Sequence, residues 1–291
     1  MSQRHPIISI TGSSGAGTTS VKRTFDQIFR REKINAAYIE GDAFHRYDRA
    51  EMRQAMDEEA KRGNMRFSHF GPEANLLEDL AAVFKQYSES GTGRTRHYVH
   101  DAAESSLYGK PPGTFTAWEE FPKDSDLLFY EGLHGAVVTP TANVAQYPDL
   151  KIGVVPVINL EWIQKIHRDK ESRGYTTEAV TATILRRMPD YVQYIVPQFS
   201  ETHVNFQRVP TVDTSNPFVA RWIPTPNESI VVIRFANPRG IDFPYLLSMI
   251  PDSFMSRANS ICIPGGSLDL AMQLILTPLI LKLIDQKRRI R

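Results

Sequence analysis

Residues 7–19 read IISITGSSGAGTT, and this stretch decides the fold. The β-branched run at residues 7–10 predicts a short buried strand that ends at a glycine-rich loop. After the loop, apolar residues recur at spacings of three and four, which predicts a helix from about residue 18 to 31. A second strand is predicted at residues 36–40. Strand, loop, helix and strand in this order form a βαβ unit, which implies a parallel sheet.

The rest of the chain continues this α/β pattern. Further strands are predicted at residues 96–100, 127–131, 150–160, 209–213 and 229–235, and helices at residues 50–63, 73–88, 176–188 and from 267 onward. No linker divides the 291 residues into independent parts. We therefore expect a single domain over residues 1–291.

The composition argues against several classes of protein. A net charge of +1 provides no global field for nucleic acid or for a membrane surface. The single cysteine, Cys262, permits no intramolecular disulfide. The apolar stretch at residues 268–284 contains Asp269 and Lys282 and is shorter than the roughly 20 residues of a membrane span, so it predicts a buried or subunit-facing helix. No signal-peptide pattern opens the sequence, and we expect a cytoplasmic protein.

A candidate phosphate-binding loop is formed by Gly12, Ser13, Ser14, Gly15, Ala16, Gly17, Thr18 and Thr19. Between a strand and a helix, glycines let backbone N–H groups converge on phosphate oxygens, and the helix N-terminus adds positive charge. Thr19 occupies the position whose hydroxyl binds Mg²⁺. Thr18, however, replaces the lysine of the G-x-x-x-x-G-K-[ST] pattern. Either the loop is no active nucleotide site, or another basic residue supplies the missing charge.

Two carboxylates follow predicted strands, at the edge where open α/β sheets bind ligands. Glu131 directly follows the apolar run 127–130. An acid at the end of a buried strand beside a P-loop can reach Mg²⁺. The alternative is that Glu131 is an ordinary acid at a strand end, exposed to solvent. Asp42 follows the second strand and could accept the proton of an attacking hydroxyl. Asp42 could also cap a helix that starts near Phe44. In a dinucleotide site, Glu40 could hold a ribose hydroxyl, which is a weaker alternative.

Cations concentrate at residues 165–174, KIHRDKESRG. Lys165, Arg168 and Arg173 could fold over a triphosphate as a lid, which would replace the missing P-loop lysine. The alternative is a solvated helix with i,i+4 pairs such as Lys165 with Asp169. Other polar residues could bind a sugar phosphate, although each alone is typical of an ordinary surface position: Arg31, His45, Arg49, Tyr98 and His100.

These segments together resemble the phosphoribulokinase family over nearly the whole chain. The resemblance rests on ISITGSSGAGTT (8–19), IEGDAFHR (39–46), FSHF (67–70), RTRHYVHD (94–101), LLFYEGLHG (127–135) and KIHRDKESRGYTTE (165–178). A P-loop without lysine is usual in this family. The resemblance implies a P-loop α/β fold of the nucleoside-monophosphate-kinase type, with a mixed, mainly parallel sheet flanked by helices and a lid at about 165–175. It also implies transfer of phosphate from ATP to the C1 hydroxyl of D-ribulose 5-phosphate, giving ribulose 1,5-bisphosphate for carbon fixation.

Roles for individual residues follow from the same resemblance. Asp42 is then the expected base, Lys165 and Arg168 the expected stabilisers of the transition state, and Asp169 an acidic residue of the lid. Glu131 and Thr19 are the expected Mg²⁺ ligands. The substrate is expected to contact His45, Arg49 and Arg173, with Tyr98, His100 and Arg31 as further candidates.

The resemblance also bears on regulation and assembly. The bacterial branch of the family is an octamer that NADH activates and AMP inhibits, and Arg234 and Arg257 resemble positions of that control. One cysteine cannot form the dithiol switch of the plant branch. A related kinase, such as a uridine or pantothenate kinase, is the alternative activity. A catalytically inactive nucleotide-sensing module is the alternative from a different class.

Overall fold

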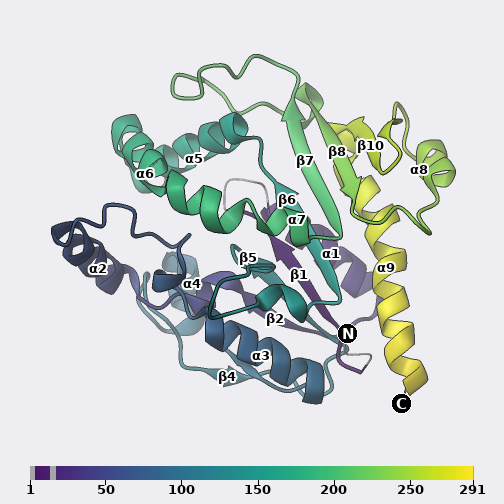
Figure 1. Ribbon diagram of the computed structural model, residues 1–291, viewed down its shortest axis with the longest axis horizontal. Helices are drawn as coiled ribbons and strands as arrows, with labels where there is room; N and C mark the ends of the chain where they lie inside the picture. Colours follow the sequence, from purple (N-terminus) through teal and green to yellow (C-terminus); the bar gives the residue numbers. More distant parts are fainter. Residues whose placement is uncertain (1–3, 14–17, 291) are drawn as a thin grey trace.

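The structure is a computed structural model that describes residues 4–13 and 18–290. Its centre is one eight-stranded sheet in the order β2-β5-β1-β6-β7-β8-β10-β9 (Figure 1). The first five strands are parallel: β2 (Ala36–Glu40), β5 (Leu127–Gly132), β1 (Ile7–Thr11), β6 (Leu150–Val155) and β7 (Val204–Pro210). The last three are antiparallel: β8 (Ser229–Phe235), β10 (Ser260–Pro264) and β9 (Phe254–Arg257). This mixed, mainly parallel sheet confirms the predicted fold class.

Helices cover both faces of the sheet. On one face, α1 (Thr18–Glu32), α8 (Phe243–Met249) and α9 (Leu268–Ile290) share a core with the strands, in which Phe25 and Ile275 are buried with Ile8. On the other face, α3 (Leu77–Ser90) buries Phe84 against the sheet. Full burial of such a side chain contributes about 1.5–3 kcal/mol. The remaining elements are α2 (Arg49–Lys61), α4 (Ala102–Tyr108), α5 (Ile158–Arg173), α6 (Thr177–Asp190), α7 (Gln198–Glu201) and the small hairpin of β3 (Arg94–Thr95) with β4 (Glu119–Glu120).

Helix α9 contains the most apolar stretch of the described chain. Residues 265–289 are long and apolar enough to cross a membrane by length and composition alone. Helix α9 nevertheless lies along the sheet (Figure 1). Its residues Ala271, Met272, Leu276 and Ile280 are fully buried in the core that it shares with the strands. Packing in the core accounts for this apolar face, which fits the first alternative of the predicted buried or subunit-facing helix.

Helices α5 and α6 form an antiparallel pair beyond the carboxyl ends of the parallel strands (Figure 1). Ile166 of α5 packs against Val180 and Ile184 of α6. Gly174 ends α5 with a φ of 67°, a left-handed conformation that glycine adopts without steric cost. The predicted lid, residues 165–175, is therefore the second half of α5 and the turn into α6.

Two predicted strands are wrong in position, and two strand pairs, β9 with β10 and β3 with β4, were not predicted. Residues 96–100 form no strand, and only an isolated bridge joins Tyr98 to Phe115. Strand β7 covers residues 204–210 rather than 209–213, because Val204 and Phe206 are the residues that enter the core beside β6. The β10–β9 pairing was missed because both strands are short and contain polar residues, serine in both and arginine in β9, among their apolar residues.

Candidate active site

The carboxyl ends of β2, β5, β1 and β6 meet at one edge of the sheet, and the candidate phosphate loop follows β1. The N–H of Gly12 donates to the carbonyl of Gly132 at 3.2 Å, which joins the start of the loop to the end of β5. Ser13 is buried at this point. The predicted nucleotide-binding residues Ser14, Gly15, Ala16 and Gly17 lie outside the described residues, as do the side chains of Thr18 and Thr19.

Two glycines allow the segments after β2 and β5 to touch. A Cβ on Gly132 would lie 2.6 Å from the Cα of Gly41, and a Cβ on Gly41 would lie 2.7 Å from the hydroxyl of Tyr130. No other residue type fits such an approach. A short 3-10 turn, Gly41–Phe44, starts here and places the Asp42 carboxylate at the edge of the sheet.

The Asp42 carboxylate lies beside two imidazoles. Its Oδ1 is 3.1 Å from Nε2 of His45, and its Oδ2 is 3.7 Å from Nε2 of His100. The alternative in which Asp42 caps a helix is wrong, because the following helix, α2, is capped by Asp48. The side chain of Asp42 remains 38% exposed, so a substrate hydroxyl can reach it.

Electrostatics keep Asp42 ionised. Burial favours the neutral acid, but the charge and hydrogen bond of His45 outweigh it, and His100 adds to the effect, so the pKa of Asp42 lies well below its usual value. The pKa of His45 is lowered by burial but raised more strongly by Asp42 and by a hydrogen bond to Asn75. Each group of this pair thus favours the charged form of the other.

His45 is fixed from behind by residues that the sequence analysis did not single out. Its Nδ1 lies 2.8 Å from Oδ1 of Asn75, and its ring stacks on His69 with centroids 4.1 Å apart. The Asn75 amide in turn donates to the carbonyls of His69 and Gly71 at 2.9 and 2.6 Å. This network fixes the orientation of the imidazole that faces Asp42. The only sequence signal for this network was the FSHF segment at residues 67–70, which was noted as part of the family resemblance.

The predicted sugar-phosphate residues Arg49, Tyr98 and His100 lie together beside Asp42. The Arg49 guanidinium donates to the carbonyl of His100 at 3.0 Å. The Tyr98 ring lies 5.0 Å from the ring of His100 and 6.4 Å from that of His45. Two segments of the chain, around residues 42–49 and 98–100, thus meet beside one carboxylate. The side chain of Arg173, the fourth predicted contact, lies outside the described residues.

The cations of α5 form a second cluster, around Asp169. Lys165 Nζ lies 2.6 Å from one carboxylate oxygen of Asp169, and Arg168 lies 3.2 Å from the other. The predicted i,i+4 pair therefore exists, but it is not a solvated surface pair, because Asp169 is 3% exposed. Burial lowers the pKa of Lys165 to about 8, with Arg187 and Arg168 lowering it further and Asp169 opposing them.

Glu161, one turn before Lys165, links this helix to the phosphate loop and was not predicted. It is buried, accepts a hydrogen bond from the Ser13 hydroxyl and accepts a second from Tyr191 at 3.2 Å. Burial raises its pKa, although both hydrogen bonds and the nearby cations oppose the rise. The spacing of four residues to Lys165 was a signal that both side chains share one helix face.

Arg187 of α6 connects the two clusters. Its positive charge lowers the pKa of both His45 and Lys165, so the imidazole beside Asp42 and the ammonium on α5 share one neighbour. The Arg187 guanidinium also lies 5.7 Å from the ring centre of Phe70. The base candidate and the cations of α5 therefore border the same region.

Glu131 and Glu40 offer oxygen ligands at the ends of β5 and β2. They are register partners, and Glu131 also pairs with Ile10, so both acids face α1. Lys22 of α1 lies 2.6 Å from Glu40. Burial lowers the pKa of Lys22, but Glu40 and then Glu131 raise it above its ordinary value. Mg²⁺ is held in kinases by one or two carboxylates together with phosphates, so this pair fits the ion, although no set of three potential ligands occurs in the described chain.

Three predicted site residues lie elsewhere. Arg31 is at the far end of α1, where it donates to Gln273 and Thr277 of α9, so the structure corrects its assignment to the sugar-phosphate site. Arg234 and Arg257 belong to the antiparallel part of the sheet, on either side of Ser260. This neighbourhood is separated from β2 by four parallel strands.

Comparisons with known proteins agree with the motifs. A family model described as "Phosphoribulokinase / Uridine kinase family" matches residues 7–215. A protein of Nitrobacter vulgaris named phosphoribulokinase is 76% identical, over 99% of this chain and 100% of its own. One of Xanthobacter flavus with the same name is 73% identical over 99% of each chain. A solved structure titled phosphoribulokinase from Rhodobacter spheroides has a TM-score of 0.91 at 64% identity, covering 99% of this chain and 100% of its own. The resemblance seen in the sequence is confirmed.

Proposed function

The chain belongs to the phosphoribulokinase/uridine kinase family, and from this membership we propose that it transfers the γ-phosphoryl group of ATP to the C1 hydroxyl of D-ribulose 5-phosphate. The names of the full-length relatives favour this reaction over uridine phosphorylation. Within the molecule, it is supported by one arrangement above all. An ionised, accessible carboxylate at Asp42 is surrounded by Arg49, Tyr98 and His100, which suit a phosphorylated substrate rather than a nucleoside.

In the proposed mechanism, Asp42 accepts the C1 hydroxyl proton. As the proton moves to the carboxylate, the O1 oxygen forms a bond to the γ-phosphorus, and the bond from that phosphorus to the β–γ bridging oxygen breaks to release ADP. The imidazole of His45 orients the carboxylate through its 3.1 Å contact. Arg49 and His100 hold the 5-phosphate, and with it the hydroxyl, in place.

The cations of α5 supply the charge that Thr18 cannot. Lys165 and Arg168 stabilise negative charge on the transferring group, and Asp169 holds both in position. Glu161 keeps their helix against Ser13 of the phosphate loop. Glu131, with Thr19, is the proposed holder of Mg²⁺, which when bound neutralises charge on the β- and γ-phosphates.

The assembly and its control are proposed from the bacterial relatives. Arg234 and Arg257 flank Ser260 and present two guanidinium groups suited to the phosphates of NADH as an activator. We propose a cytoplasmic homo-octamer with this nucleotide control. The single buried cysteine, Cys262, is consistent with control that does not use a dithiol.

An ADP-release assay with a panel of acceptors tests the proposed reaction. The expected order is rapid turnover with ribulose 5-phosphate and little or none with ribulose or uridine. The same assay with and without NADH tests the proposed activation. Turnover with uridine but not with ribulose 5-phosphate would identify a nucleoside kinase instead, and binding of Mg-ATP without ADP release from any acceptor would identify a sensing module.

A further inference from the structure

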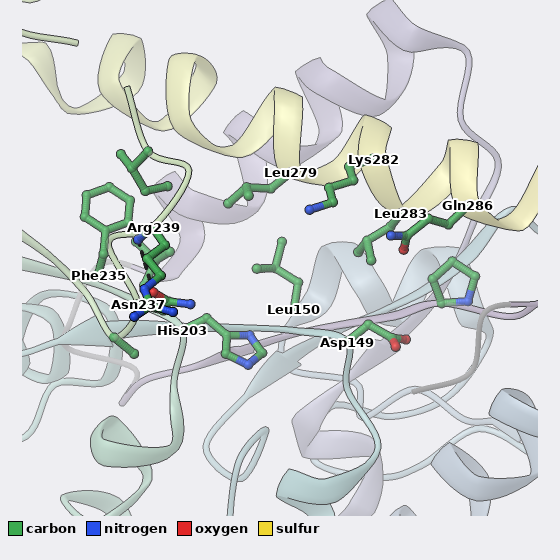
Figure 2. A pocket seen from close by; sticks show the side chains of 14 residues that line it. Asp149, Leu150, His203, Phe235, Asn237, Arg239, Leu279, Lys282, Leu283 and Gln286 are labelled. Carbon is green, nitrogen blue, oxygen red and sulfur yellow. Dashed lines mark hydrogen bonds between the residues drawn. The ribbon is translucent and has the colours of Figure 1, made fainter. Parts of the chain in front are cut away.

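A pocket of about 360 Å³ lies at the amino ends of the parallel strands, opposite the edge that carries Asp42 (Figure 2). It is bounded by the start of β6, the start of β7, the end of β8 and the second half of α9. Its size is within the range of small-molecule sites. None of the residues placed in the proposed reaction lines it.

The inner surface of the pocket is mainly apolar. Leu150 of β6 faces Leu279 and Leu283 of α9 across the space, and Phe235 closes one end (Figure 2). Leu279 and Leu283 are only partly buried, so each leaves apolar surface open to the pocket. An apolar group that fills this space would remove that surface from water.

Two cations without a carboxylate partner border this apolar surface. Lys282 on α9 directs its ammonium group into the space, and Arg239 lies at the end formed by residues 235–239 (Figure 2). Both side chains are exposed, and neither forms an ion pair with any residue that the structure describes. Elsewhere in the described chain, Lys22, Arg62 and Lys165 are each paired with an acid.

The remaining titratable groups of the pocket do not neutralise these cations. His203 accepts a hydrogen bond from the backbone N–H of Lys151 at Nδ1, which places its proton on Nε2. Asp149 accepts from the N–H of Ile7 and lies at the opposite end of the pocket from Arg239 (Figure 2). Burial raises the pKa of Asp149 to about 6, although the hydrogen bond from Ile7 opposes the rise. Lys282, which lies between Leu279 and Leu283 on α9, and Arg239, at one end of the pocket, thus border the apolar surface without an acid to balance them (Figure 2).

We propose that this pocket binds a small amphipathic anion, an apolar body that carries one carboxylate group. The carboxylate lies between Lys282 and Arg239, and the body packs on Leu150, Leu279 and Leu283. The site is separate from the phosphoryl-transfer centre, so this proposal stands or falls independently of the proposed reaction.

Three probes that share an eight-carbon chain and differ in the terminal group test the proposal: octanoate, 1-octanol and octylammonium. Each is titrated into the full-length protein and its binding is measured by calorimetry. Octanoate is expected to bind saturably, octanol about tenfold more weakly, which corresponds to about 1.4 kcal/mol, and octylammonium not measurably. The variants Lys282→Met and Arg239→Gln each remove one positive charge, and each is expected to weaken octanoate binding about tenfold without changing basal phosphoryl transfer.

Two further variants make the result decisive. Lys85→Met removes an exposed lysine on α3, outside the pocket, and should leave octanoate binding unchanged. Leu283→Trp fills the pocket and should abolish binding; thermal unfolding establishes that it remains folded. The proposal is overturned if octanoate shows no saturable binding, if octanol binds as tightly, or if Lys282→Met and Lys85→Met bind octanoate alike.

Discussion

Asp42 and Asp169 are both held by cations at the same edge of the sheet, but the cations differ in kind. Asp42 is 38% exposed and faces the imidazole rings of His45 and His100. Asp169 is 3% exposed and lies between a lysine and an arginine. A general base must be accessible to the substrate and able to accept its proton. A carboxylate that positions cations must instead stay ionised. The sequence alone leaves open which aspartate takes the proton, and this difference favours Asp42.

The largest effect should follow removal of the proposed base. Asp42→Asn keeps the shape of the side chain but cannot take a proton, so kcat should fall about 10³-fold or more. Mg-ATP affinity, measured by equilibrium binding, should stay near that of the unchanged protein. If Asp42→Asn kept a kcat close to that of the unchanged protein, Asp42 would not be the base, and the proposed difference in role between Asp42 and Asp169 would be wrong.

Next in size is the loss of one α5 cation. Lys165→Met should lower kcat about 10²- to 10³-fold, because it removes a fixed positive charge from the transferring group. Lys85→Met on α3 is the matched control and should behave like the unchanged protein. If both variants retain kcat, the charge missing at Thr18 is supplied elsewhere.

Glu161 offers a smaller and more specific test. Glu161→Gln and Ser13→Ala should each raise KM for ATP about tenfold with a smaller change in kcat, because α5 is no longer held against the phosphate loop. The double variant should be no worse than the worse single variant, since both remove one interaction. Additive losses would mean that the two residues act separately.

The pH profile should separate the two clusters further. Because the pKa of Lys165 is lowered to about 8, the ammonium is charged below that pH and loses its proton as pH rises through it. Turnover should therefore decline above about pH 8. In Lys165→Arg, whose side chain stays charged, this alkaline decline should disappear even if the maximal rate is lower. A decline that persists in the arginine variant would belong to another group.

The smallest effect is expected at Arg31. Arg31→Gln removes exposed hydrogen bonds to α9, so stability should drop by no more than about 1 kcal/mol. KM for ribulose 5-phosphate should be unchanged in steady-state assays. A large rise in that KM would return Arg31 to the substrate site.

The sequence predicted β1, β2 and β5 well because each is a short, mainly apolar run that ends at a loop with clear chemistry, whereas polar residues interrupt β7 and its position was predicted wrongly. It also singled out Asp42, which follows β2, and the cations Lys165 and Arg168, which stand out by the concentration of charge at residues 165–174; the roles of these three residues stay predictions. It missed Glu161 and Asn75, whose partners are 148 and 30 residues away and are joined only by the folded chain. It assigned Arg31 to the substrate site wrongly because the sequence does not show at which edge of the sheet the end of α1 lies.

The comparison of the two aspartates is tested most directly by single-turnover phosphoryl transfer in Asp42→Asn and Asp169→Asn, with ATP affinity measured on the same samples. Asp42→Asn should bind ATP normally and lose the chemical step. Asp169→Asn should bind ATP more weakly, because its cations lose their anchor, and should retain the faster chemical step of the two. The opposite pattern, with chemistry abolished in Asp169→Asn at normal ATP affinity and retained in Asp42→Asn, would contradict the account.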